Sequence, residues 1–166
     1  SKTPFYAESG GQIADRGVLT HSEFILDVAD VQKIGSDIVH FCNIKKEIKK
    51  NFPDIIKKDN TLDAVIDIDR RAQIRLNHTS THLLHSALKQ VLGDHVQQAG
   101  SLVSPEKLRF DLTHYEKIDN KQIKEIEDRV NAIIRQNIRL ETTVETYELA
   151  KKSGALALFG EKYEDK

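Results

Sequence analysis

The sequence predicts an α+β protein, in which a small β-rich, barrel-like N-terminal lobe precedes an α+β lobe with helices packed on an antiparallel sheet. Turn signals alternate with short β-prone runs over the first forty-odd residues. A helical pattern then runs from about Asp69 to Gly93, and a second one follows two further β-prone runs. With 166 residues, 39% of them hydrophobic, the chain can fill one core or two small lobes.

The N-terminal lobe carries its turn signals at "SGG" and "DRG". The runs "EFILDVADVQKI" and "DIVHFCNI" flank "GSD", which is typical of a β-hairpin. The following segment, "KKEIKKNFPDIIKKDN", is rich in lysine and broken by Pro53, so we expect an exposed connection. These signals predict a β-rich lobe over residues 1–58, including the connection, and an α+β lobe over 59–166.

The second lobe begins with "TLDAVIDID", which alternates like a strand, and its first helix ends at Gly93, a residue suited to a C-cap. Two strands are predicted in "HVQQAGSLV" and "KLRFDLT", joined by "SPE". We expect a further strand around "RLETTVETY" and a short helix near "ELAKKSG", followed by "ALALFGEKY". The second long helix presents one apolar stripe to a sheet: Ile123, Ile126, Val130, Ile133 and Ile134.

The overall charge excludes a global field for nucleic acid or membranes, since 25 basic residues face 26 acidic ones. A single cysteine, Cys42, excludes an internal disulfide and favours a reducing compartment, where we expect it to serve packing. No apolar run approaches the roughly 20 residues that span a bilayer. We therefore predict a cytoplasmic protein without membrane contact. The start at Ser1 without a methionine and the charged end "GEKYEDK" indicate a piece of a longer protein.

The first helix carries three histidines in "NHTSTHLLH": His78, His82 and His85. On a helical wheel they lie within about 60° of one another. Arg71, Arg75 and Lys89 share their side, so this face suits a polyanion or a metal ion. Apolar residues occupy the opposite arc: Leu76, Leu83, Leu84, Ala87, Leu88 and Val91.

His78 and His82 are one helical turn apart, close enough for two imidazoles to share a tetrahedral zinc ion. His85 lies about 10 Å further along the axis than His78, so other ligands must complete the site. Four residues are possible sources, although none has a second ligand at a convincing spacing: His40, Cys42, His95 and His114. A solvated surface face is an equally good interpretation of an isolated H-x-x-x-H pattern.

Three long stretches resemble the editing region of alanyl-tRNA synthetases, in the same order: "TPFYAESGGQIADRG", "RLNHTSTHLLHSALKQVLGDHVQQAGSLVSPEKLRFDLTH" and "GALALFGEKYEDK". The resemblance implies an aminoacyl-tRNA deacylase that hydrolyses tRNA(Ala) mischarged with serine or glycine. The longer ligase would bind ATP and supply the remaining domains. Residues 59–166 would then be an editing lobe that meets the tRNA(Ala) acceptor end.

The same resemblance implies a zinc site built from H-x-x-x-H, here His78 and His82, and a later C-x-x-x-H. The second half would follow the "FGEKY" run, and this sequence ends at Lys166 first. We therefore expect zinc to be absent or incompletely ligated, and the isolated chain to be inactive or weak. By position in the matched motifs, Thr81, Gln98 and Ser101 correspond to residues that line the amino-acid pocket.

A regular strand would send Gln98 and Ser101 to opposite faces, so both can line one pocket only if Gly100 forms a bulge. The alternative for Thr81 is a helix-surface hydroxyl that bonds back to a carbonyl, and for Gln98 an ordinary exposed glutamine. Arg71, Arg75 and Arg109 are predicted to meet the tRNA phosphates. For Lys89 a solvated charge is the alternative.

Other interpretations stay open. "GGQ" also occurs in peptide release factors, but three residues are a weak signal, and we predict a glycine turn of the β lobe. A free-standing trans-editing deacylase and the editing domain of threonyl-tRNA synthetase share the H-x-x-x-H pattern. From a different class, the chain would be a non-catalytic tRNA-binding or interaction module with the histidine helix as its docking face.

Overall fold

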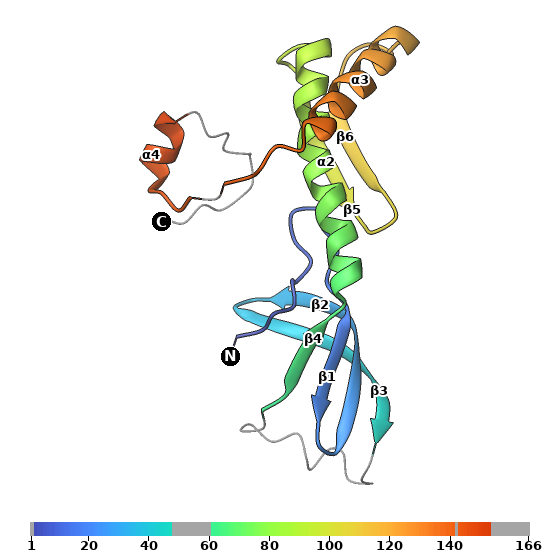
Figure 1. The fold of residues 1–166 in the computed structure, drawn as a ribbon, viewed down its shortest axis with the longest axis vertical. Helices are drawn as coiled ribbons and strands as arrows, with labels where there is room; N and C mark the ends of the chain where they lie inside the picture. Colours follow the sequence, from blue (N-terminus) through green and yellow to red (C-terminus); the bar gives the residue numbers. More distant parts are fainter. Residues whose placement is uncertain (1, 48–60, 142, 154–166) are drawn as a thin grey trace. The chain divides into compact units, whose positions relative to one another are not determined.

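The computed structural model describes residues 2–47, 61–141 and 143–153, and it confirms an α+β fold (Figure 1). The chain divides into two compact units, residues 1–130 and 131–166, which are described separately. The first unit holds a four-stranded sheet, a β-hairpin and the long helices. In the described residues, no helix has the length and apolar character needed to cross a membrane.

The four-stranded sheet is antiparallel throughout, with the strand order β3-β2-β1-β4. The predicted β2–β3 hairpin is confirmed, with Gly35 at φ 63° in its turn. The predicted barrel is wrong: in the described residues, β3 and β4 are the two edges of an open sheet, because each pairs with one neighbour only. The strands are β1 (Gly17–His21), β2 (Phe24–Ile34), β3 (Asp37–Glu47) and β4 (Asp63–Ile66).

β4 pairs with β1, with Val65 opposite Val18, so the sheet includes a strand from beyond the lysine-rich connection. The predicted division at residue 58 lies within 48–60, outside the described residues. One core cluster supports this sheet, and it includes buried side chains from the N-terminal segment as well as from β2: Phe5, Ala14, Val28 and Val31.

Helix α2 (Ile68–Leu92) begins one residue before the predicted start at about Asp69, and it ends at the predicted C-cap Gly93. The Asp67 side chain accepts a hydrogen bond from the Arg70 backbone N–H at 2.9 Å, which caps the N-terminus. Gly93, at φ 115°, ends the helix, and its N–H donates to the Lys89 carbonyl. Local capping chemistry therefore fixes both ends of the histidine helix.

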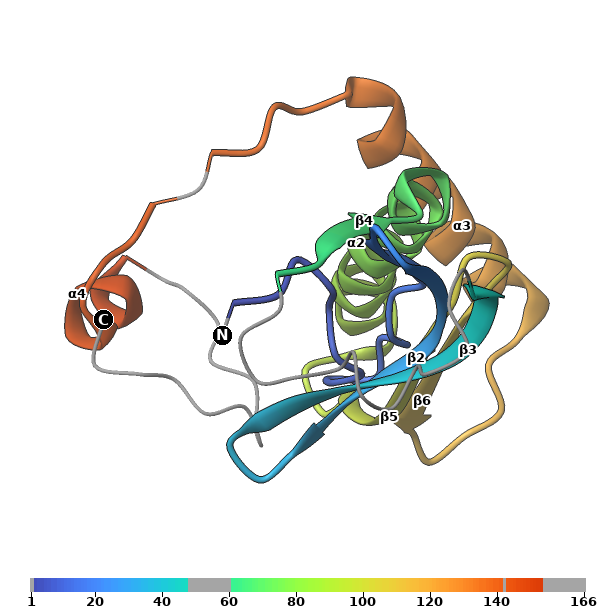
Figure 2. The ribbon, with the colours of Figure 1, turned by 90° about the horizontal axis from the view of Figure 1, so that it is seen from below.

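The two-stranded sheet of β5 (Gln97–Val103) and β6 (Leu108–Thr113) packs against α2. The part of helix α3 (Asn120–Gln136) that belongs to the first unit lies beside α2 (Figure 2), and it adds Ile126 and Val130 to the core cluster with Phe110 and Leu112. The prediction of helices on an antiparallel sheet is confirmed, although that sheet is a single hairpin.

The second unit contains the end of α3 and the short helix α4 (Tyr147–Lys152), which confirms the helical turn predicted near "ELAKKSG". The strand predicted around "RLETTVETY" is wrong over residues 139–141 and 143–146, which form no strand. Leu140 and Val144 are exposed there, because alternation alone does not make a strand without a neighbouring backbone to pair with. The predicted segment "ALALFGEKY" lies outside the described residues.

Candidate functional site

His78 and His82 lie on one edge of α2 with stacked rings, whose centroids are 5.2 Å apart at an interplanar angle of 28°. His78 is half-buried and His82 is exposed. The predicted pairing of these two imidazoles one turn apart is therefore present in the structure. A spacing of one helical turn is what two imidazoles need in order to share a tetrahedral zinc ion.

The sequence did not indicate that Gln12 contacts this pair. Its Oε1 lies 2.6 Å from Nδ1 of His78, and Gln12 is only 7% exposed. Because an amide carbonyl oxygen accepts, Nδ1 of His78 donates this hydrogen bond, and in the neutral ring the lone pair then lies on Nε2. That is the tautomer a metal-binding imidazole needs when it binds through Nε2.

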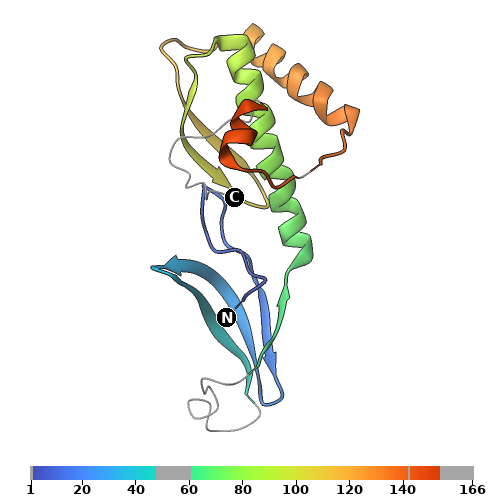
Figure 3. The ribbon, with the colours of Figure 1, turned by 90° about the vertical axis from the view of Figure 1, so that its left-hand side faces the viewer.

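The turn that carries Gln12 lies against strand β5. The backbone N–H of Val103 donates to the Gly11 carbonyl at 2.8 Å, and that of Ile13 donates to the Val103 carbonyl at 3.2 Å. Gly11, at φ 81°, packs so closely that a Cβ there would lie 2.6 Å from the Ser101 carbonyl oxygen. The predicted glycine turn exists, but it docks on the hairpin as well as on its own lobe, as the dark blue segment shows (Figures 1 and 3).

An ion pair holds the same N-terminal segment to α2. Asp15 is 1% exposed, and its carboxylate accepts from Nε of Arg71 at 2.8 Å and from Nη2 of Arg71. It also accepts from the Tyr6 N–H at 2.7 Å, while Arg71 Nη2 donates to the Pro4 carbonyl at 3.0 Å. The hydrogen bonds to Asp15 raise the pKa of Arg71 despite its partial burial. Arg71, a predicted phosphate contact, thus has an internal partner that the sequence did not indicate.

The predicted bulge in β5 is confirmed by a register shift between Gln98 and Gly100. Gln98 lies opposite Leu112, and Ser101 lies opposite Phe110. Directly opposed residues share a face of an antiparallel pair, and both partners on β6 pack into the α2 cluster. The bulge therefore brings Gln98, which is exposed, and Ser101, which is half-buried, to the helix side of the hairpin.

Thr81 is buried on α2, and its hydroxyl donates to the Asn77 carbonyl at 2.9 Å, which is the back-bonded arrangement considered as its alternative. Its oxygen keeps lone pairs that can accept from a substrate. Asn77 was not singled out by the sequence. Its Nδ2 donates to the Ser104 carbonyl at 2.8 Å and to the Pro105 carbonyl at 3.1 Å, which ties α2 to the hairpin turn.

The third histidine lies against the hairpin instead of on a solvated face. The His85 ring packs on Phe110 with centroids 5.1 Å apart, and burial, followed by the charge of Lys89, lowers its pKa. Leu76, placed in the apolar arc, is 70% exposed. Both placements were wrong, whereas Ala87 and Leu88 of the predicted apolar arc are buried. The buried side of α2 also includes Ile74 and Thr81, which lie nearer the histidine side than predicted.

The other predicted cations differ in exposure. Arg75 is exposed and Lys89 is half-buried. Arg109 is exposed and forms an ion pair with Asp111, with 3.0 Å between Nε and Oδ1. Contact of Arg75 and Arg109 with nucleic acid stays a prediction.

The residues considered as further zinc ligands lie in other groups. His95 Nε2 and His114 Nδ1 are 2.9 Å apart, and His95 also stacks on Tyr115. His40 contacts Thr3 Oγ1 at 2.9 Å, and burial lowers its pKa. Burial also raises the pKa of Cys42, ahead of the charge of Asp27. Within residues 2–47, 61–141 and 143–153, no three His, Cys, Asp or Glu side chains gather as a metal site.

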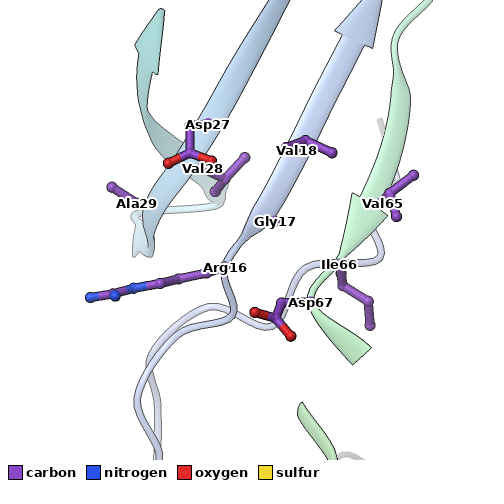
Figure 4. Close-up of a pocket in the computed structure, with 9 residues that line it drawn as sticks. All are labelled: Arg16, Gly17, Val18, Asp27, Val28, Ala29, Val65, Ile66 and Asp67. Atoms are coloured by element: carbon purple, nitrogen blue, oxygen red, sulfur yellow. The ribbon is translucent and has the colours of Figure 1, made fainter. Parts of the chain in front are cut away.

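A hollow of about 560 Å³ lies elsewhere, on the four-stranded sheet (Figure 4). Arg16 and Asp67 flank it beside β1 and β4, and Asp27 reaches it from β2. None of its lining residues is a predicted site residue. We place the candidate site at the histidine pair because the Gly11–Gln12 turn contacts His78 and also lies against Ser101.

Comparison with known proteins identifies the relatives of this chain. The family model "tRNA synthetases class II (A)" matches residues 1–70. The "Alanine--tRNA ligase" of Legionella pneumophila strain Lens is 52% identical over 98% of this chain, as is that of strain Corby. The protein of strain Paris is 50% identical over the same share. The chain is homologous to alanine--tRNA ligases over nearly its whole length.

The chain spans about 18% of the length of these alanine--tRNA ligases. The class II match covers the four-stranded sheet and the Gln12 turn, whereas His78 lies beyond it but within the ligase homology. The predicted resemblance to alanyl-tRNA synthetases agrees with this similarity. The editing role, the zinc and the pocket residues stay predictions.

Proposed function

We propose that this chain is the editing part of an alanyl-tRNA synthetase, which hydrolyses the ester of tRNA(Ala) mischarged with serine or glycine. One observation carries the proposal: the Gly11–Gln12 turn contacts Ser101 on one side and His78 on the other. A predicted pocket residue and a predicted metal ligand therefore flank the same turn. Homology to alanine--tRNA ligases supports the substrate class.

We propose that His78 and His82 hold a zinc ion in the longer protein. Their stacked rings and the proton on His78 Nδ1 suit this role, and the other ligands would come from outside the described residues. Bound zinc would orient the ester or polarise the attacking water. An aminoacyl ester is already activated, so positioning by the protein supplies much of the remaining catalysis.

We propose that Thr81, Gln98 and Ser101 recognise the amino acid. Gln98 and Ser101 share the helix side of the hairpin, and Thr81 is buried on the helix facing it. A serine hydroxyl can pair with such groups, whereas alanine would leave them unpaired, at a cost of about 1–3 kcal/mol. This difference would spare correctly charged tRNA.

The acceptor end of tRNA(Ala) would meet the exposed cations Arg75 and Arg109. We leave Arg71 out, because its guanidinium is held by Asp15 and Pro4. The rest of the ligase would supply ATP-dependent aminoacylation in the cytoplasm.

The test is serine release from Ser-tRNA(Ala) by the full-length protein that carries this chain. His82→Ala should lower the rate by more than about 100-fold, as expected for loss of a metal ligand. His114→Ala is the matched control, since it also removes one ring of a stacked histidine pair, and it should leave the rate unchanged. Equal rates for wild type and His82→Ala would contradict the proposal. Weaker tRNA binding without any deacylation would favour a non-catalytic module.

The class II match to residues 1–70 favours a second candidate, in which the N-terminal lobe belongs to the aminoacylation unit. Arg16, beside the hollow of Figure 4, provides the test. Under this candidate Arg16→Ala slows alanylation of tRNA and spares serine release. If it alters neither reaction, this candidate fails.

A further inference from the structure

We infer that Gln12 is a positioning residue for His78, which fixes the imidazole tautomer and ring orientation so that Nε2 faces a zinc ion. This inference rests on the proposed function, because it concerns the same histidine pair. It assigns a role in the site to the N-terminal lobe, which the sequence analysis treated as a separate unit.

The contact itself is short and shielded. Gln12 Oε1 lies 2.6 Å from His78 Nδ1, and Gln12 is almost completely buried. This hydrogen bond is partly buried, so water competes less for its atoms than for those of an exposed bond, and His78 is held more firmly. His78 stacks on His82 as well, so the orientation of one ring constrains its neighbour.

The turn that presents Gln12 is held at three places. Its backbone bridges to Ser9, with the Gln12 N–H donating to the Ser9 carbonyl at 2.9 Å. Backbone hydrogen bonds to Val103 hold it on β5, and the Asp15–Arg71 ion pair holds the following residues on α2. Gly11 permits this approach, because a Cβ would collide with Ser101. These contacts fix the Gln12 backbone before any metal binds.

The chemistry explains why an amide suits this position. A side-chain carbonyl that accepts from Nδ1–H raises the basicity of the imidazole and holds its lone pair on Nε2. Loss of such a partner typically costs a metal site about 10–100-fold in affinity. Packing alone would preserve the backbone of the turn but would not set the histidine tautomer.

The experiment measures zinc affinity by competition with a chelator, in the full-length protein that carries this chain. Gln12→Leu keeps similar bulk without an acceptor and should weaken zinc binding by about 10–100-fold. Gln12→Glu keeps an acceptor oxygen, and its charge should make binding as tight as in the wild type or tighter. Gln97→Leu, an exposed glutamine on β5, is the matched control and should leave the affinity unchanged.

Three outcomes would overturn the inference: an unchanged affinity for Gln12→Leu, equal losses for Gln12→Leu and Gln12→Glu, or weaker binding by Gln12→Glu than by wild type. The last one remains decisive if Gln12→Leu does not fold. His78→Ala separates this inference from the proposed function. If His78→Ala leaves zinc affinity intact, the proposed zinc site fails; if it abolishes binding while Gln12→Leu does not alter it, only the role of Gln12 fails.

Discussion

Two histidine pairs in this molecule look alike but differ in what surrounds them. The rings of His78 and His82 have centroids 5.2 Å apart, and those of His95 and His114 are 5.1 Å apart. His95 and His114 are bonded directly to each other, with 2.9 Å between Nε2 and Nδ1. A tetrahedral zinc ion with ligands at about 2.0–2.1 Å would separate its two nitrogens by about 3.4 Å. The second pair is therefore closed to zinc as it stands.

The first pair is oriented from outside by a different part of the chain. Gln12 accepts from His78, and the segment that carries it is held on α2 and β5. Ring stacking alone therefore does not mark a metal site. What distinguishes the first pair is an additional partner of His78, namely Gln12, which accepts from Nδ1.

The largest expected effect is a loss of stability when the Asp15–Arg71 ion pair, which holds the Gln12 segment on α2, is removed. Arg71→Leu leaves the buried Asp15 carboxylate without its cation and should lower the free energy of unfolding by about 3–5 kcal/mol. Arg109→Leu removes an exposed arginine–aspartate pair and should cost less than about 1 kcal/mol. Urea unfolding measures both. Equal losses would mean that the anchor contributes no more than a surface ion pair.

A smaller loss of stability is expected from a substitution within the Gly11–Gln12 turn itself. Gly11→Ala introduces a Cβ that collides with Ser101 and strains φ, so it should cost about 2–3 kcal/mol. Gly35→Ala also strains a positive φ, but nothing lies near its Cβ, so it should cost only about 1 kcal/mol. Thermal unfolding measures both variants. If the Gly11 variant is no less stable than the Gly35 variant, the turn does not need its close approach to β5.

Gln97 and Gln98 are adjacent on β5 and lie opposite Thr113 and Leu112, so their side chains point to opposite faces of the hairpin. Gln98→Ala should slow serine release from Ser-tRNA(Ala) by about 10-fold, because one hydrogen bond of about 1–1.5 kcal/mol is lost. Gln97→Ala, at the neighbouring position, should leave the rate unchanged. The measurement is single-turnover deacylation by the full-length protein. Reversed effects would show that the other face of the hairpin recognises the substrate.

The smallest effect is a pH dependence of protein stability that arises from His85. Burial against the hairpin holds the pKa of His85 below its ordinary value of 6.5. The unfolded chain therefore takes up this proton first, and stability falls as the pH drops from about 7 to 5. His85→Leu should make that fall shallower, and His40, whose pKa burial also lowers, should account for part of the remaining slope. The measurement is the free energy of unfolding of wild type and His85→Leu between about pH 7 and 5. The same pH dependence in both proteins would contradict this prediction.

The sequence was most informative where the signals are local. The helix predicted from about Asp69 to Gly93 matches α2, and the bulge considered at Gly100 is present as a register shift between Gln98 and Gly100. The sequence was uninformative where the structure depends on a contact between residues that are distant in the chain. Gln12 and His78 are 66 residues apart, and no periodicity in either segment indicates their contact.

The errors have the same origin. Four strands with good alternation do not specify whether a sheet closes, and β3 and β4 remain separate edges among the described residues. The stretch around Leu140 and Val144 alternates, but no strand forms there because pairing needs a second backbone. On α2, the buried stripe depends on where the hairpin docks, which the helical wheel does not contain.

The most direct measurement is a zinc-edge anomalous diffraction map of the full-length protein that carries this chain. We predict one peak about 2.0–2.1 Å from Nε2 of His78 and from an imidazole nitrogen of His82, with Gln12 still hydrogen-bonded to Nδ1 of His78. We predict no peak at His95 and His114. A zinc ion at the second pair, or one bound without His78 and His82, would contradict it.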